Sequence, residues 1–211
     1  MSYNLEEQDQ IEQLRDFWQR WGTAVSALLL LVALAWAGWS GWNWWQRRES
    51  AQASNLYSQL SQRIAASDLK DATPIFQRLR DDYASTAYAQ MGALTVARAY
   101  ADGGQAQQAQ SVLRWAAGHG PIAAQRAAAM LDLAAMQIDA HQFDAALQTL
   151  RKPPASSFSA LFLTGRGDVY AAQGEREQAR KAYTKALAEL PADAALRQLL
   201  QIKLDSVGGA A

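Results

Sequence analysis

The sequence predicts an all-α protein in which a single N-terminal transmembrane helix precedes an α-solenoid of about four helix pairs and a C-terminal capping helix. Three observations support this fold class: a long run without charged residues near the N-terminus, apolar residues that recur every three or four positions after residue 48, and a unit that returns with alanines in fixed places. We expect a head at 1–20, a transmembrane helix at 21–45, a repeat domain at 46–205 and a flexible tail at 206–211.

The head is acidic. Residues 1–45 carry two basic and five acidic side chains, and the other 18 basic and 15 acidic side chains follow, so the two parts have net charges of −3 and +3. Neither charge is high enough to indicate nucleic acid as a partner. A helical head would bring its apolar residues onto one face, namely Ile11, Leu14, Trp18 and Trp21. This face could lie on the membrane surface or bind a basic partner, and a solvated extension of the next helix is an equal alternative.

The run between Arg20 and Arg47 contains no charged side chain. A helix over 21–45 would be roughly 37 Å long, and the hydrocarbon core of a bilayer is about 30 Å thick. Tryptophans lie near both ends of the run, as is typical of membrane interfaces, at Trp18, Trp21, Trp42, Trp44 and Trp45. No basic region precedes the run and no clean small-residue cleavage site follows it, so we expect a retained anchor and not a cleaved signal peptide.

Small residues recur every four positions within this run, at Ala33, Ala37 and Gly41. Such a face lets a second membrane helix approach closely, although alanine and glycine are also common in ordinary spans. The charges at the two ends of the run balance, with two arginines on either side, so charge alone does not fix the orientation.

The segment LTGRGDVYAAQGEREQARKAYTKALAELP, at 163–191, contains the clearest repeat unit. Its seven marked positions have a fixed order of residue type: small, aromatic, turn, alanine, aromatic, alanine and proline. They are Gly167, Tyr170, Gly174, Ala179, Tyr183, Ala186 and Pro191. This order resembles the tetratricopeptide repeat. Small residues permit two helices to cross closely, and proline stops the second helix.

Earlier copies of the unit align on the first alanine of the second helix. These alanines, Ala72, Ala109, Ala146 and Ala179, are separated by 37, 37 and 33 residues. A perfect array would show about 34. Large residues follow four positions later, at Phe76, Leu113, Leu150 and Tyr183. The repeat domain is therefore predicted to be tetratricopeptide-repeat-like, with a plain helical bundle as the alternative, and 192–204 is predicted to be the capping helix.

No combination of residues indicates catalysis or a metal site. The chain has no cysteine, and its two histidines, His119 and His141, lie in predicted turns without neighbouring metal ligands. No glycine-rich phosphate loop occurs. We therefore expect a protein that is not an enzyme and needs neither a metal nor a cofactor.

A stack of helix pairs presents a concave groove that suits protein binding. In the register of the tetratricopeptide repeat, the candidate groove residues are Tyr57, Met91, Leu94, Arg98, Leu131, Ile138, Leu161, Thr164 and Asp168. Most are apolar, and the set lacks the several basic residues that would hold a peptide's terminal carboxylate. The groove would fit an extended apolar segment or a partner's helix, unless the helix at 55–66 or the C-terminal cap covers it.

The whole layout resembles the YfgM family. Three segments carry the resemblance: LRDFWQRWG in the head, WNWWQRR at the end of the apolar run, and RLRDDYASTAYAQMGAL between two helix pairs. The resemblance implies a bitopic inner-membrane protein of a Gram-negative bacterium, with a cytoplasmic head and a periplasmic repeat domain. It also implies an ancillary subunit of the SecYEG translocon that associates with a membrane-anchored periplasmic prolyl isomerase.

We accordingly expect a non-catalytic translocon subunit that binds a periplasmic chaperone or emerging secretory proteins through its repeat domain. No nucleic acid and no small-molecule substrate are expected. Two alternatives remain: a membrane-anchored regulator of an envelope stress response, which would act through the acidic head, and a scaffold of another envelope assembly.

Overall fold

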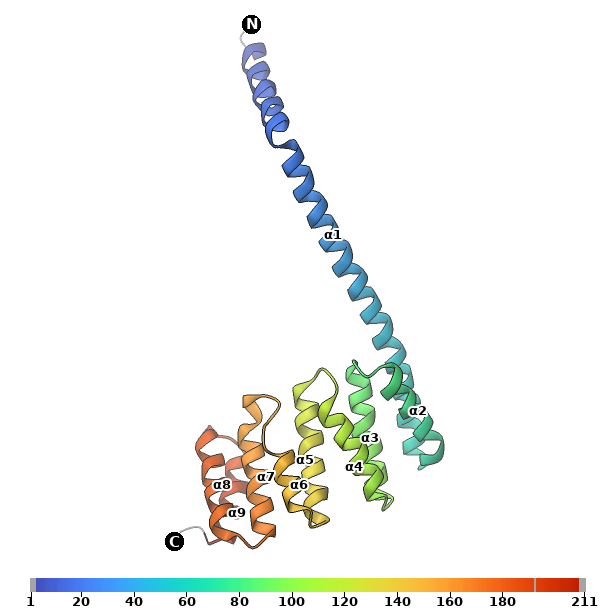
Figure 1. Ribbon diagram of the computed structural model, residues 1–211, viewed down its shortest axis with the longest axis vertical. Coiled ribbons are helices and arrows are strands. Elements are labelled where there is room, and N and C mark those ends of the chain that lie inside the picture. The colour runs from blue at the N-terminus through green and yellow to red at the C-terminus, as the bar shows by residue number, and fades with distance from the viewer. Residues whose placement is uncertain (1–2, 192, 209–211) are drawn as a thin grey trace. The chain divides into compact units, whose positions relative to one another are not determined.

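The structure, a computed structural model, describes residues 3–191 and 193–208 (Figure 1). The chain divides into two compact units, Met1–Arg48 and Glu49–Ala211. The described residues form nine α-helices and one 3-10 helix, which are α1 (Tyr3–Ala65), α2 (Leu69–Asp82), α3 (Ala87–Asp102), α4 (Ala106–Gly118), α5 (Ala123–Asp139), α6 (Phe143–Thr149), η1 (Ser156–Phe158), α7 (Ser159–Ala172), α8 (Arg176–Glu189) and α9 (Leu196–Ser206). The prediction of an all-α helical repeat is confirmed.

The first unit is the part of α1 that ends at Arg48. Its described apolar side chains are exposed, among them Leu30, Leu34, Trp36 and Trp39. In the part of the chain that the structure describes, no helix combines the length and the apolar composition needed to cross a membrane.

Several predictions concern side chains outside those that the structure describes. These are the head at 1–20 with its apolar face, part of the predicted transmembrane helix at 21–45, and the end of the predicted tail at 209–211. The face of Ala33, Ala37 and Gly41 is described, and all three residues are exposed. An added Cβ at Gly41 would meet nothing within 4 Å.

The second unit is a row of antiparallel helix pairs. The C-terminal part of α1 shares a core with α2, and the next pairs are α3 with α4, α5 with α6, and α7 with α8. Figure 1 shows α2 to α9 packed beside one another in chain order, with α9 against the last pair. The connection between α2 and α3 is tied back to α1, because Tyr83 Oη donates to Gln52 Oε1 at 3.1 Å and Ser85 Oγ donates to Glu49 Oε1 at 2.8 Å.

The alanines that set the predicted register are buried at equivalent places. Ala72, Ala109, Ala146 and Ala179 are each 0% exposed, in α2, α4, α6 and α8. The large residues one turn later, Phe76, Leu113, Leu150 and Tyr183, are at most 3% exposed. An alanine lets the two helices of a pair approach, and the large residue fills the space beside the crossing.

The turn inside each pair repeats one backbone conformation. Ser67, Gly104, His141 and Gly174 have φ values of 58°, 73°, 57° and 80°. Each precedes its register alanine by five residues. At Gly174, the amide of the next residue, Glu175, donates to the carbonyl of Tyr170 at 2.9 Å, which satisfies a free carbonyl at the end of α7. Glycine adopts this left-handed conformation without steric cost, whereas serine and histidine do not.

This common turn predicts opposite effects for reciprocal substitutions. Ser67→Gly is expected to raise the free energy of unfolding by about 0.5–1 kcal/mol, because it removes a Cβ from a left-handed position. Gly174→Ser is expected to lower it by a similar amount, since it adds one. Urea denaturation followed by circular dichroism measures both. Changes of the same sign in the free energy of unfolding for the two substitutions would contradict the equivalence of the turns.

Candidate protein-binding groove

A cavity of about 960 Å³ opens between the end of α1, the start of α2, and helices α3 and α5. Its apolar wall contains Ile64, Leu69, Leu94 and Met136. Leu94 and Arg98 lie one turn apart on α3, so both side chains face the same space. Of the predicted groove residues, these two are brought together in the cavity.

Three charged side chains line the cavity as well, Arg98 and Asp102 from α3 and Asp132 from α5. The concave walls exclude part of the water around the Asp132 carboxyl group, although its surface remains exposed, and this desolvation raises its pKa. The positive charge of Arg98 acts in the opposite direction and lowers it. The cavity thus combines apolar walls with two acidic groups and one basic group.

Removal of the Arg98 charge should therefore raise the pKa of Asp132 further. A carboxyl-carbon NMR titration of the Arg98→Gln variant measures this shift, and Arg114→Gln, at an exposed position of α4 that does not line the cavity, is the control. An unchanged titration in Arg98→Gln would contradict the proximity of the two charges.

The raised pKa of Asp132 also changes how the free energy of unfolding depends on pH. The folded pKa lies above the unfolded value, so the ionised Asp132 lowers the free energy of unfolding at neutral pH. This cost disappears as the pH falls through the folded pKa, and Asp132→Asn should abolish that part of the pH dependence.

Five other predicted groove residues lie beside the cavity lining or farther along the stack. Tyr57 and Met91 are partly buried, and the ring of Tyr57 lies 6.0 Å from that of Tyr88. Leu131 and Ile138 pack against the core formed by α5, α6 and α7. Leu161 is 38% exposed on α7. These residues are partly accessible, but they are not gathered around one cavity in the described part of the chain.

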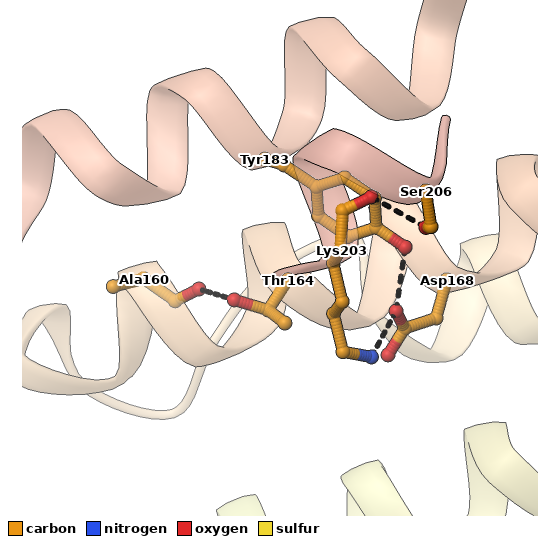
Figure 2. A network of polar contacts seen from close by, with 6 residues as sticks. All are labelled: Ala160, Thr164, Asp168, Tyr183, Lys203 and Ser206. Atoms are coloured by element: carbon orange, nitrogen blue, oxygen red, sulfur yellow. Dashed lines mark hydrogen bonds and ion pairs between the residues drawn. The ribbon is translucent and has the colours of Figure 1, made fainter. Parts of the chain in front are cut away.

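The predicted groove positions of the last pair are engaged within the protein itself. Thr164 is 7% exposed, and its hydroxyl donates to the carbonyl of Ala160 at 2.8 Å. Asp168 accepts a hydrogen bond of 2.7 Å from Tyr183 Oη and pairs with Lys203 Nζ at 2.5 Å (Figure 2). Thr164 and Asp168 thus have contacts within the protein, and their assignment to the groove stays a prediction.

The contacts of Asp168 affect the pKa of Tyr183. Burial of the Tyr183 hydroxyl raises its pKa, and the hydrogen bond to the Asp168 carboxylate raises it further, because the phenol must remain protonated to donate. The network thus joins α7, α8 and α9 through one carboxylate. Sequence reasoning missed Lys203, since α9 does not follow the repeat register.

Both histidines have structural contacts. The His119 ring stacks on Trp115 with centroids 4.9 Å apart, and its Nδ1 lies 2.8 Å from the Trp115 carbonyl oxygen. His141 occupies the left-handed turn and packs edge-on against Phe143. Among the described residues, no group of three His, Cys, Asp or Glu side chains is placed to hold a metal ion.

Comparisons with known proteins identify relatives of the whole chain. The tetratricopeptide repeat-like domain family matches residues 15–209. An ancillary SecYEG translocon subunit from Neisseria gonorrhoeae is 30% identical over 211 residues, which covers 98% of this chain and 100% of that protein. A protein of the same name from Haemophilus influenzae is 26% identical and covers 88% of this chain and 91% of its own length.

Solved structures support the same fold. A kinesin-light-chain-type protein from Podosopora anserina, with nearly identical repeats of the tetratricopeptide type, matches with a TM-score of 0.52 at 16% identity. The match covers 75% of this chain and 85% of that one. BtubC from P. vanneervenii gives a TM-score of 0.52 at 16% identity and covers 76% and 82% of the two chains. At this identity the likeness concerns the fold alone.

Proposed function

The chain belongs to the YfgM-like family with a tetratricopeptide repeat-like domain, and from this premise we propose that it is an ancillary, non-catalytic subunit of the SecYEG translocon. The observation that carries the proposal is the identity of 30% over 98% of the chain to a protein of that name. The cavity at Leu94 and Arg98 supports a binding role for the repeat domain.

The proposal includes a membrane anchor at 21–45, with a cytoplasmic head at 1–20, a periplasmic repeat domain at 46–205 and a short tail at 206–211. The uncharged run and the tryptophans at its ends support this arrangement. The exposed face of Ala33, Ala37 and Gly41 would pack against a membrane helix of the translocon. Protease protection in inverted and right-side-out vesicles tests the orientation, and release of the chain by alkaline extraction would contradict the anchor.

The repeat domain would bind a membrane-anchored periplasmic prolyl isomerase, another chaperone or an emerging secretory protein. Apolar walls around Leu94 and Ile64 suit an apolar segment of such a partner, and Arg98 offers one charged contact. The neighbouring accessible residues extend the surface on both sides, namely Tyr57, Met91, Leu131, Ile138 and Leu161. Attachment to one membrane raises the effective concentration of partners, so that weak contacts suffice.

Photo-crosslinking tests this assignment. A photoreactive residue in place of Leu94 should crosslink a translocon subunit, a chaperone or a secretory client in intact cells. The same residue in place of Gln148, at an exposed position of α6 outside the cavity, is the control. Copurification in mild detergent identifies the partners. Recovery of an envelope assembly or a stress regulator without SecYEG would contradict the proposal and favour one of the two alternatives.

A further inference from the structure

A second hollow, of about 370 Å³, lies between the two helices of the last pair. All of its lining residues lie on α7 and α8. Six of them are Leu163, Arg166, Tyr170, Gln178, Lys181 and Lys185. On each helix these residues are three or four positions apart, so they form one stripe per helix. The two stripes face each other and bring three basic side chains around one space.

These three basic side chains form no ion pair with the described residues of the chain. In the part of the chain that the structure describes, no carboxylate oxygen lies within 4.0 Å of the charged nitrogens of Arg166, Lys181 or Lys185. Nearby acidic groups are used elsewhere, since Glu177 pairs with Arg180 at 3.1 Å and Glu175 accepts from Gln178 at 2.6 Å. Gathered like charges repel one another, and a bound anion would relieve the repulsion.

The floor of the hollow is apolar. Leu163 and Tyr170 are partly buried against the core of α8 and α9, and Ala182 is 8% exposed. A bare inorganic ion would contact the basic rim but leave this floor uncovered. An anion carried on a carbon side chain satisfies both parts, because its charged group meets the rim and its hydrocarbon part covers the floor.

We propose that the hollow between α7 and α8 binds an acidic segment of a partner protein, in which Asp, Glu or the C-terminal carboxylate alternates with aliphatic residues. Arg166 would hold a carboxylate through two parallel hydrogen bonds, and Lys181 and Lys185 would add point charges beside it. Leu163 and Tyr170 would contact the neighbouring aliphatic side chain. This site is separate from the cavity at Leu94.

A protein segment fits the hollow better than a lipid surface does. A bilayer presents a plane of headgroups, which favours a flat or protruding basic face. Here the cations surround a concavity of about 370 Å³, which has room for a carboxylate and a neighbouring aliphatic side chain. The groove positions of the repeat register do not include Arg166, Lys181 or Lys185, so the basic hollow is distinct from the groove that the sequence predicts.

The test uses the full chain in a neutral detergent and a fluorescent probe peptide in which Glu and Leu alternate. Fluorescence anisotropy should report binding that weakens as salt is added. The matched peptide with Gln in place of Glu and an amidated C-terminus should bind about tenfold more weakly. The double variant Lys181→Gln, Lys185→Gln should lose about tenfold in affinity for the Glu peptide. Lys70→Gln, at an exposed position of α2, should not change the affinity.

A charge-reversal variant distinguishes loss of the binding site from unfolding of the protein. The variant Lys181→Glu, Lys185→Glu should no longer bind the Glu peptide and should instead bind a matched peptide of alternating Lys and Leu. An unfolded chain would not show this exchange of selectivity. Equal binding of the Glu and Gln peptides would overturn the proposal. Binding to phosphatidylglycerol vesicles that requires Lys181 and Lys185, without binding of the peptide, would overturn it in favour of a lipid headgroup. Because the purified chain is used alone, either result leaves the translocon assignment standing.

Discussion

The substitution Gly167→Ala is expected to lower the free energy of unfolding of the repeat domain by about 1–3 kcal/mol. Gly167 of α7 lies against the ring of Tyr183 on α8, and an added Cβ would overlap that ring. The ring is held in place, because it is 2% exposed and its hydroxyl donates a hydrogen bond of 2.7 Å to Asp168. The added methyl group therefore forces α7 and α8 apart. Urea denaturation followed by circular dichroism measures the loss.

A matched substitution separates this clash from a general effect of alanine. Gly118 ends α4, and an added Cβ there would meet nothing within 4 Å. Gly118→Ala is expected to cause no loss of stability, since alanine favours helix over glycine. Replacement of Tyr183 by the smaller leucine should cost less in the Gly167→Ala background than in the natural one, as expected for two residues in contact. Additive losses, or a stable Gly167→Ala variant, would show that the two helices do not cross here.

The repeat register could be predicted because it depends on local residue size. Every helix pair needs a small residue at the crossing and a left-handed turn five residues earlier, so Ala109 and Gly104 are readable from the sequence alone. His141 was also placed correctly in a turn by this spacing, although histidine is an unusual residue there. Because each helix pair has the same requirement for a small residue and a left-handed turn, the same spacing of residues recurs in each repeat.

The candidate binding surface was harder to predict, because it depends on contacts between units that do not repeat. The register predicts Asp168 as a groove residue, and in the structure its carboxylate, on a side chain that is 33% exposed, pairs with Lys203 of α9. The docking of α9 follows no periodic pattern, so the partner of Asp168 had no signal in the sequence. The basic hollow was missed for a related reason. It requires the side stripes of α7 and α8 to face each other, whereas the repeat register concerns only the concave stripe of the first helices.

The substitution Leu200→Ala is expected to lower the free energy of unfolding by about 2–5 kcal/mol, because it leaves a cavity in the core that joins α9 to α8. Leu200 is 0% exposed and belongs to a cluster with Tyr183, Ala186 and Leu204. Its neighbour Leu199 is 47% exposed on the other side of α9, so Leu199→Ala should stay within about 0.5 kcal/mol of the natural protein.

The comparison of Leu200→Ala with Leu199→Ala also tests the capping role of α9. A terminal repeat needs a partner for its open apolar face, so weaker docking of α9 should loosen α8 before the earlier pairs. Hydrogen exchange should therefore quicken first at the amides of α8 and α9 in Leu200→Ala, while those of α3 remain protected. Loss of the ion pair with Lys203 would then expose the Asp168 side chain beyond its present 33%. Equal losses for Leu199→Ala and Leu200→Ala, or uniform exchange along the stack, would mean that α9 does not stabilise the array as a cap.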